Sequence, residues 1–309
     1  MKKYCILLLS LVLLSCDNSD DSLDFIAAVE SELGVSSTNS PLGGEGHFFE
    51  SVAYGTAERQ ELDILLPEGE QFKGVLLFFH GGGFTSGDKS NAFDDYLVET
   101  MQTVLDNDIA IVSANYTLLS TAGNEGVLSA LEDGEAALNF LRSKLSLLNI
   151  SSDKMVIAGV SAGAGIAQWN GFQAPNNTQL QGVLAIAAQS SYDLYQWENV
   201  FPGFSLDALR QLIPYLQALY LQFYNGEPTP EALATLDYRA LMDASDPPLY
   251  VYNTAGDEVI NAQGELDFDV LYHSYRHADY LRQQAIEVGQ AFSGAFQESP
   301  EEFVLRVLE

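Results

Sequence analysis

The chain has 309 residues, of which 47% are hydrophobic and 18% are charged. This length fits one large α/β domain or two small ones, and the apolar content is enough for a full core. The formal net charge of −30 excludes nucleic-acid binding, because so acidic a surface repels polyanions, and it also opposes binding to anionic lipid.

Residues 1–15 have the features of a secretory signal peptide. Two lysines precede the apolar run 5–14, which is too short to span a bilayer. The sequence Leu-Leu-Ser-Cys at 13–16 resembles a bacterial lipobox, which implies that Cys16 is lipidated and anchors the mature chain to the outer membrane. Ordinary cleavage, with Cys16 left as a free thiol, is the alternative. The acidic residues that follow resemble the signal that sends some bacterial lipoproteins to the cell surface.

Removal of the signal peptide changes the cysteine count and the charge. The chain has two cysteines, and the loss of Cys5 leaves Cys16 alone, so we expect no intramolecular disulfide despite export. Two of the 13 basic residues are lost as well, which makes the mature charge 11 minus 43, or −32.

The remaining sequence predicts a tether at 16–45, with a short helix at 23–34, followed by an α/β domain at 46–309. Strand patterns occur at 47–54, 61–67, 74–80, 110–116, 155–160, 182–189 and 249–254. Helical patterns occur at 91–106, 124–148, 162–173 and 274–288. This alternation predicts a mainly parallel sheet flanked by helices and opened by an antiparallel pair. Active sites on such sheets lie at the carboxyl ends of the strands.

The segment 190–245 interrupts this alternation. It is rich in aromatic residues, is mostly helical, and contains Pro214. Because it is inserted between two predicted strands, we expect a helical cap over the strand ends. Two interpretations of its aromatic side chains stay open: they pack the cap onto the body, or they line a substrate pocket.

Ser161 stands in a Gly-x-Ser-x-Gly sequence, between Gly159 and Gly163. An apolar strand pattern ends at this motif, and a small-residue helix pattern begins directly after it. This context predicts a tight turn that exposes a nucleophilic serine at a helix N-terminus, where the helix dipole favours a developing negative charge. The alternative is an ordinary strand-to-helix turn.

A second glycine motif, His-Gly-Gly-Gly, occupies residues 80–83. Glycines allow neighbouring amide groups to point at one oxygen without steric conflict. We therefore expect Gly82 and Gly83, together with the amide of Ala162, to form an oxyanion hole, in which one donor is worth roughly 3–4 kcal/mol. His80 is interpreted as a structural residue of this loop.

The motifs HGGGF, SANYTL at 113–118 and GVSAGAG together resemble the hormone-sensitive-lipase-like esterase branch of the α/β-hydrolase fold. The resemblance covers about residues 45–290 and implies an α/β-hydrolase domain whose cap precedes the seventh main strand. It also implies that no cofactor is needed. In this family the catalytic acid lies nine residues after a proline pair, which here points to Asp257, with Glu258 as a second choice. A solvated loop acid is the alternative.

The chain departs from the family at the catalytic base, because no histidine follows His277. The family's histidine comes after the last strand, which here corresponds to 291–297, so Gln297 or Glu298 takes its place. A final helix is still predicted at 301–308, with Ser299 as its N-cap residue.

His277 is our first candidate for a relocated base and His273 is the second, because the helix after the Asp257 loop begins on the active-site side. In a second interpretation both histidines merely contact the cap and the site is impaired. The third is a metal site, based on the i,i+4 spacing of the two histidines. Its further candidate ligands are Glu265, Asp267 and Asp269, although Arg276 argues against zinc.

The sequence therefore predicts a serine carboxylesterase at the cell envelope. Its substrate is expected to be a small-molecule or carbohydrate-linked ester, and short acyl groups on polysaccharides follow from the resemblance. The alternative is a non-catalytic binding protein of the same fold, favoured by the missing C-terminal histidine.

Overall fold

The structure, a computed structural model, describes residues 18–94, 96–260 and 265–309. The predicted signal peptide at 1–15 and the predicted lipidation site at Cys16 lie outside these residues. Within the described ranges, no helix has the length and apolar character needed to cross a membrane.

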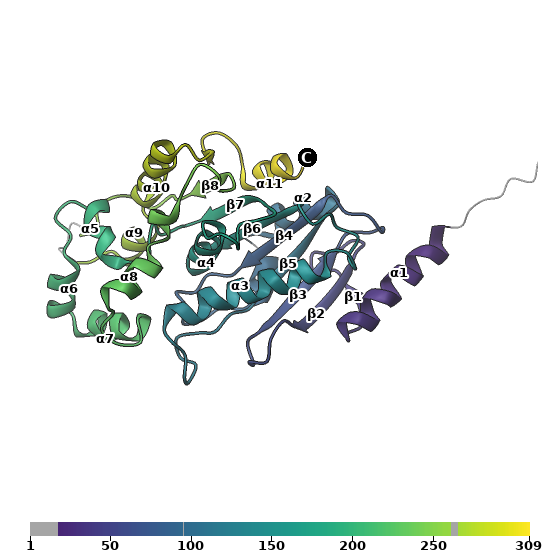
Figure 1. The fold of residues 1–309 in the computed structure, drawn as a ribbon, viewed down its shortest axis with the longest axis horizontal. Coiled ribbons are helices and arrows are strands. Elements are labelled where there is room, and N and C mark those ends of the chain that lie inside the picture. Colours follow the sequence, from purple (N-terminus) through teal and green to yellow (C-terminus); the bar gives the residue numbers. More distant parts are fainter. Residues whose placement is uncertain (1–17, 95, 261–264) are drawn as a thin grey trace, which may run out of the picture.

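A single sheet of nine strands runs through the molecule (Figure 1). Its order is β1-β2-β3-β5-β4-β6-β7-β8-β9. The strands from β5 through β9 are parallel, whereas β1, β2 and β3 form an antiparallel edge. Their bounds are β1 Thr38–Asn39, β2 His47–Ala53, β3 Glu61–Leu66, β4 Gly74–Phe79, β5 Ile109–Ala114, β6 Met155–Val160, β7 Leu180–Ile186, β8 Leu249–Tyr252 and β9 Phe292–Gly294.

The central strands are buried on both faces, as expected for parallel strands covered by helices. All six residues of β4 are buried. Leu77 and Phe79 belong to the core on one face, whereas Leu76 and Phe78 belong to the core on the other. This alternation explains why the strand patterns read as continuous apolar runs rather than as an apolar–polar alternation.

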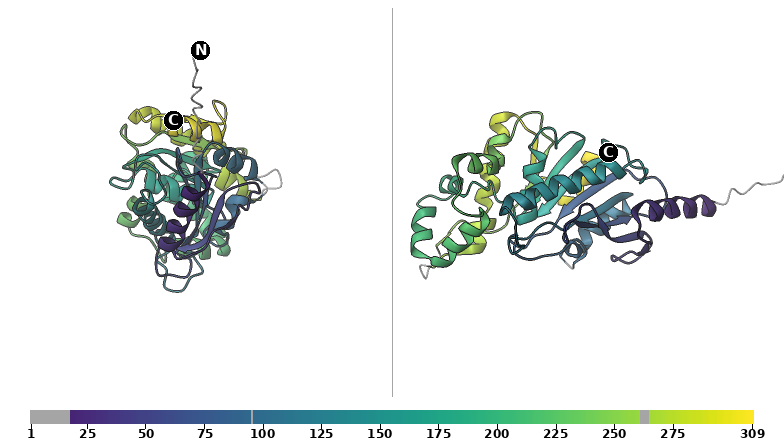
Figure 2. Two further views of the ribbon diagram at one scale, coloured as in Figure 1. Left: turned by 90° about the vertical axis from the view of Figure 1, so that its right-hand side faces the viewer. Right: turned by 60° about the horizontal axis from the view of Figure 1, so that its bottom comes forward.

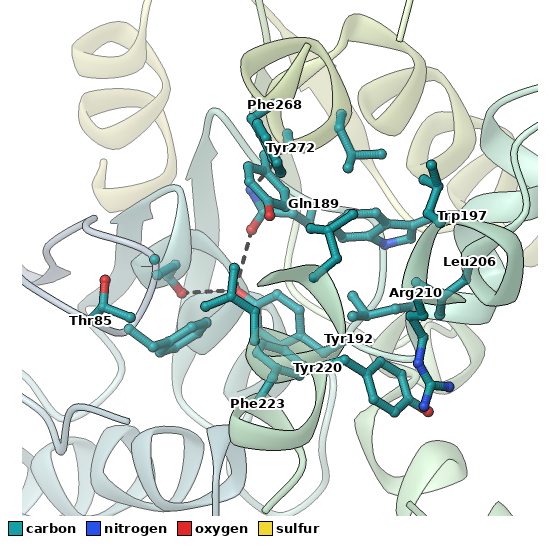
Figure 3. Close-up of a pocket in the computed structure, with 18 of the residues that line it drawn as sticks. Thr85, Gln189, Tyr192, Trp197, Leu206, Arg210, Tyr220, Phe223, Phe268 and Tyr272 are labelled. Atoms are coloured by element: carbon teal, nitrogen blue, oxygen red, sulfur yellow. Dashed lines mark hydrogen bonds between the residues drawn. The ribbon is translucent and has the colours of Figure 1, made fainter. Parts of the chain in front are cut away.

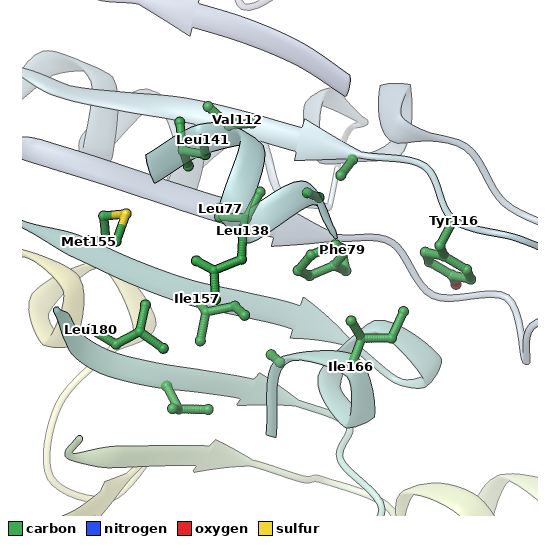
Figure 4. Close-up of a cluster of buried hydrophobic side chains, with 14 of the residues drawn as sticks. Leu77, Phe79, Val112, Tyr116, Leu138, Leu141, Met155, Ile157, Ile166 and Leu180 are labelled. Atoms are coloured by element: carbon green, nitrogen blue, oxygen red, sulfur yellow. The ribbon is translucent and has the colours of Figure 1, made fainter. Parts of the chain in front are cut away.

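Helices cover the two faces of the sheet. One face carries α3 (Val127–Lys144), α4 (Ala162–Gly171) and α10 (Tyr275–Val288). The other carries α2 (Val98–Asp106), preceded by the 3-10 turn η1 (Lys89–Phe93), together with α11 (Pro300–Leu308). Figure 4 shows Leu138 and Leu141 of α3 over the strand residues of the first face.

The final helix begins as its sequence predicts. The Ser299 side chain accepts a hydrogen bond from the backbone amide of Glu302, and the Glu302 carboxylate accepts one from the amide of Ser299. This reciprocal capping, with Pro300 in the first turn, confirms the predicted start of α11.

The N-terminal segment differs from the tether expected at 16–45. Residues Asn18–Leu33 form the helix α1, which is longer than predicted. Ile26 and Val29 are buried in the core of the domain, and Lys144 of α3 forms an ion pair with Glu32. Because α1 contributes to the core, at least residues 25–39 belong to the folded domain.

Between β7 and β8 the chain forms the cap, which consists of short helices. Figures 1 and 2 show these helices gathered at one end of the molecule, with α1 at the opposite end. After β8 come α9 (Phe268–His273) and α10, which lie beside the cap. The cap elements are η2 Leu194–Gln196, α5 Trp197–Val200, α6 Leu206–Leu212, α7 Pro214–Phe223, α8 Pro230–Leu236 and η3 Tyr238–Leu241.

Candidate active site

Ser161 lies at the turn between β6 and α4, directly at the helix N-terminus. Its backbone has φ 52° and ψ −115°, a conformation that costs energy for a residue with a side chain. The amide of Ser161 donates to the carbonyl of Ile186 at 2.8 Å, which holds the strained turn against the next strand. The serine side chain is thereby presented at the carboxyl end of the sheet.

The two glycines of the turn are needed because backbones approach closely there. A side-chain carbon on Gly159 would overlap the backbone of Gly163, and one on Gly163 would overlap the carbonyl of Phe79. The strand, the turn and the helix therefore fit together only with glycine at these two positions.

The structure places His273 against Ser161. The two side chains meet at 3.0 Å between Ser161 Oγ and His273 Nε2. His273 is the last residue of α9, and Asp269 stands one turn earlier on the same helix, with its carboxylate 2.7 Å from His273 Nδ1. Asp267 caps this helix by accepting hydrogen bonds from two backbone amides.

These contacts define the protonation of the neutral His273 ring. A carboxylate only accepts hydrogen bonds, so Nδ1 must carry the proton that it donates to Asp269. Nε2 is then free to accept the hydroxyl proton of Ser161. The arrangement is a chain of hydroxyl, imidazole and carboxylate, in the order that a serine-hydrolase triad has.

His277, the first sequence candidate for the base, does not reach Ser161. Its ring is fully buried, with Nε2 donating to the carbonyl of Leu271 at 3.0 Å and Nδ1 accepting from the Ser190 hydroxyl at 2.9 Å. The rings of Trp197 and Phe201 from the cap pack on it edge-to-face. Both ring nitrogens are occupied, so the expected contact between His277 and Ser161 is wrong, and the histidine that contacts Ser161 is His273, the second candidate.

Asp257, the first sequence candidate for the acid, is also engaged elsewhere. Its carboxylate forms an ion pair with Arg276 at 2.7 Å and accepts a hydrogen bond from the Tyr275 hydroxyl at 3.1 Å. The hydrogen bond from Arg276, followed by that from Tyr275, lowers the pKa of Asp257. The structure therefore places Asp269, not Asp257, beside His273, and Glu258 is exposed.

Sequence reasoning missed Asp269 as an acid because the family pattern directs attention to the loop after β8. A usable signal was present, since Asp269 and His273 have the i,i+4 spacing that brings two side chains together on one helix face. Of Gln297 and Glu298, the two residues expected in place of the C-terminal histidine, Glu298 forms an ion pair with Arg306.

The glycine loop lies beside Ser161. Gly82 has φ 110° and Gly83 has φ 59°, both in the region that favours glycine. The carbonyl of Gly82 accepts hydrogen bonds from the amides of Thr85 and Ser86, which folds the loop back on itself. Gly83 and Ala162 line the same cavity as Ser161.

A buried polar network fixes this loop from behind. His80 stacks on Tyr116 with 4.3 Å between ring centroids, and the Tyr116 hydroxyl donates to the carbonyl of His80. The Arg59 guanidinium reaches His80 Nε2 at 3.2 Å and also donates to the Gly87 carbonyl and the Asn115 side chain. Burial lowers the pKa of His80 to about 4, so the ring is neutral, with Nε2 accepting from Arg59. This agrees with its interpretation as a structural residue.

A cavity of about 360 Å³ opens at Ser161 and extends beneath the cap. Figure 3 shows aromatic and leucine side chains around it, with the Tyr192 hydroxyl near Gln189. That hydroxyl donates to the carbonyl of Ala162 at 3.0 Å. A cap aromatic can both pack the cap onto the body and line this cavity, since Trp197 packs on His277 and also lines the cavity.

Within 18–94, 96–260 and 265–309 no group of three or more His, Cys, Asp or Glu residues is arranged to hold a metal ion. The two histidines of the proposed metal pair have separate partners. His273 contacts Ser161 and Asp269, and His277 contacts Ser190 and Leu271.

Comparison with known proteins identifies the family to which this chain belongs. A family model described as BD-FAE matches residues 62–269, which is more than half of the chain. The chain belongs to the BD-FAE family. The matched part of this BD-FAE protein contains the glycine loop and Ser161, ends at Asp269, and therefore stops four residues before His273.

Solved structures similar to this BD-FAE protein confirm the α/β-hydrolase fold. A truncated carbohydrate esterase from gut microbiota superposes with a TM-score of 0.64 at 14% identity, over 84% of this chain and 96% of the other. A bifunctional GH43-CE protein of Bacteroides eggerthii superposes with a TM-score of 0.62 at 16% identity, over 85% of this chain and 35% of the other. Native esterase 2 of Thermogutta terrifontis superposes with a TM-score of 0.54 at 16% identity, over 80% of each chain.

Two curated relatives match shorter parts of the sequence. Juvenile hormone esterase of Tribolium castaneum is 30% identical over 123 residues, which is 36% of this chain and 19% of that protein. Acetylcholinesterase-1 of Trittame loki is 32% identical over 107 residues, which is 32% of this chain and 18% of that protein. The alignments thus span about a fifth of the length of these relatives.

Proposed function

We propose that this BD-FAE protein is a carboxylic ester hydrolase in which Ser161 is the nucleophile, His273 the general base and Asp269 the orienting acid. The observation that carries the proposal is the continuous contact from Ser161 Oγ through the His273 ring to the Asp269 carboxylate, at 3.0 and 2.7 Å. A binding protein has no need of this arrangement beside a strained serine.

In the acylation step, Ser161 Oγ forms a bond to the ester carbonyl carbon while its proton moves to His273 Nε2. The carbonyl oxygen becomes an oxyanion, which the amides of Gly82, Gly83 and Ala162 stabilise as donors. The intermediate then breaks its bond to the alcohol oxygen, which takes the proton from His273. The products of this step are the free alcohol and an acyl group on Ser161.

Deacylation repeats the sequence with water. His273 Nε2 takes a proton from the water molecule as its oxygen bonds to the acyl carbon, and the second intermediate expels Ser161, which regains a proton from His273. Asp269 stabilises the imidazolium in both steps and keeps Nδ1 protonated. No cofactor takes part.

Several similarities support an ester substrate. Curated relatives and solved structures similar to this chain are named as esterases, and two of the structures are named as a carbohydrate esterase and a GH43-CE protein. We infer from these names that the alcohol part of the substrate can be a carbohydrate. The hormone-sensitive-lipase-like branch, the lipid anchor on Cys16 and the outer-membrane location are further parts of the proposal, based on the sequence alone.

The test is turnover of p-nitrophenyl butyrate by the full chain and by Ser161→Ala and His273→Ala variants. Removing either group should lower kcat by at least about 10³-fold, because the nucleophile and its base act as one unit. Wild-type levels of turnover in Ser161→Ala would contradict the proposal, and so would a His273→Ala variant that keeps its activity. An inactive wild-type protein would favour the non-catalytic alternative.

A further inference from the structure

We propose that this protein selects its substrates by their acyl group, with a hydrophobic acyl chain buried in the cavity under the cap and the alcohol part left outside. The proposal rests on the esterase function above and deepens it. It differs from the expectation of short acyl groups, because an acetyl group leaves most of a cavity of about 360 Å³ unfilled. A cavity of this size lies near the lower end of the range for small-molecule sites.

The walls beyond Ser161 are apolar. Two cap helices contribute a large part of them through leucine side chains: Leu206 and Leu209 come from α6, and Leu216 and Leu219 come from α7. Phe223 and Tyr192 close the side toward the body of the domain (Figure 3). Such walls stabilise a bound group by removing its apolar surface from water, and they give polar groups little to bind.

Arg210 is the charged residue that lines the cavity, and its charge is already compensated. Its guanidinium lies over the Tyr220 ring at 3.5 Å from the centroid. The same group donates to Gln217 and forms ion pairs with Asp207 and Glu227. Arg210 therefore ties the cap helices together and does not offer an anion-binding site to the substrate.

The exposure of the base shows which part of an ester enters this cavity. The alcohol must leave beside His273, because it takes its proton from that ring. The side chain of His273 is 26% exposed and that of Asp269 is 75% exposed, so solvent reaches this side of Ser161. The cavity is lined by Gly83, Ala162 and the cap, and α9 adds Phe268, Leu271 and Tyr272 to its wall, whereas His273 and Asp269 lie outside the lining. The remaining substituent of the carbonyl carbon, the acyl chain, is thus directed beneath the cap.

Burial of each additional methylene should raise kcat/KM about fourfold until the cavity is full. This factor corresponds to the free energy of roughly 0.8 kcal/mol that is gained when one methylene leaves water. The size of the alcohol should have little effect, because the leaving side is open. The predicted specificity is therefore strong for the acyl group and weak for the alcohol.

The experiment measures kcat/KM of the full chain on p-nitrophenyl acetate, butyrate, hexanoate and octanoate. The same acyl series on 4-methylumbelliferyl esters changes the alcohol while keeping a phenolic leaving group. Two variants on α6 form a matched pair: Leu209→Trp fills the cavity, whereas Leu212→Trp adds the same group at a side chain that is 76% exposed. Leu219→Phe is a second, smaller cavity-filling variant.

We expect kcat/KM to rise from acetate to hexanoate on both alcohols. Leu209→Trp should lower the ratio of kcat/KM on hexanoate to kcat/KM on acetate at least tenfold, with circular dichroism and thermal unfolding showing that the variant is folded, and Leu212→Trp should match the wild type. A flat acyl series on the wild type would overturn the proposal even if no variant folds. So would equal losses in the two tryptophan variants. Because Ser161→Ala is assayed in parallel, a flat series with turnover that depends on Ser161 would leave the esterase function standing.

Discussion

At the scale of single residues, the structure reverses the order in which the sequence ranked two histidines, because His273 and not His277 contacts Ser161. His273 is partly exposed and contacts the serine, whereas His277 is buried between backbone, Ser190 and cap aromatics. A base needs an unoccupied nitrogen that reaches its proton donor, and only His273 has one in this site. His277 instead packs α10 against the cap. Its burial is expected to lower the stability of the fold at acidic pH.

Burial lowers the pKa of His277 to about 4 from 6.5. Between these values the unfolded chain binds a proton that the folded chain does not, so stability falls as the pH decreases from about 6.5 to 4. His277 alone contributes up to roughly 3 kcal/mol to this loss.

Chemical denaturation of the wild type and of His277→Gln across this pH range measures the effect. Glutamine keeps a donor for the Leu271 carbonyl but does not titrate, so the free energy of unfolding of the variant should fall less steeply with acid. The comparison of slopes removes the contribution of buried carboxyls such as Asp63 and Asp237, whose pKa values burial raises and whose effect has the opposite sign. Parallel slopes in the two proteins would show that His277 does not titrate in this way.

At the scale of elements, the site is assembled from three segments that meet at the carboxyl edge of the sheet. The turn before α4 presents Ser161, the loop after β4 presents the glycines, and α9 carries both the proposed base and the proposed acid. Because Asp269 and His273 share one helix, their relative position is set by helix geometry rather than by two separate loops.

The glycine loop depends on support from Arg59, which lies between β2 and β3. Its guanidinium bonds to the side chains of His80 and Asn115 and to the carbonyls of Gly87 and Tyr116. Arg59→Met should lower kcat by about 10- to 100-fold with little change in KM, because a displaced loop weakens oxyanion stabilisation more than substrate binding. Steady-state kinetics on p-nitrophenyl butyrate provide the test.

Arg59→Lys should recover part of the lost kcat, since a lysine replaces some of the hydrogen bonds but not the planar fork. The matched control is Arg306→Met, which removes an arginine that is paired with Glu298 away from the loop. A loss of thermal stability in Arg59→Met without a change in kcat would mean that Arg59 supports the fold alone and does not position the loop.

At the scale of the whole molecule, the sequence predicts the sheet well because its central strands are buried runs with clear boundaries. The alternating strand and helix patterns were enough to predict the parallel sheet and the position of the cap along the chain. The start of α1 was missed because residues 18–24 are mainly polar and acidic, which suggests a tether, while its docking depends on a few apolar side chains farther along. Ile26 and Val29 gain their burial only from the tertiary fold.

The site was predicted in part for a related physical reason. Ser161 and the glycines lie in turns whose backbone geometry requires particular residues at fixed spacing, so these turns can be identified from a sequence motif. The base and the acid need only meet in space, so they can move to another element while the geometry is kept. His273 was therefore the second choice and Asp269 was considered only as a metal ligand, since a family pattern does not follow such a relocation.

The most direct test of the account is the comparison of kcat for Asp269→Asn and Asp257→Asn on p-nitrophenyl butyrate. Both substitutions remove one carboxylate charge near α9 and α10, but only Asp269 contacts the ring of His273. Asp269→Asn should lower kcat by about 10²- to 10⁴-fold, because the imidazole loses its orienting acid. Asp257→Asn should keep kcat within about threefold of the wild type, since it breaks an ion pair with Arg276 that is partly exposed. The opposite ranking, with Asp257→Asn inactive and Asp269→Asn active, would contradict the Ser161–His273–Asp269 assignment.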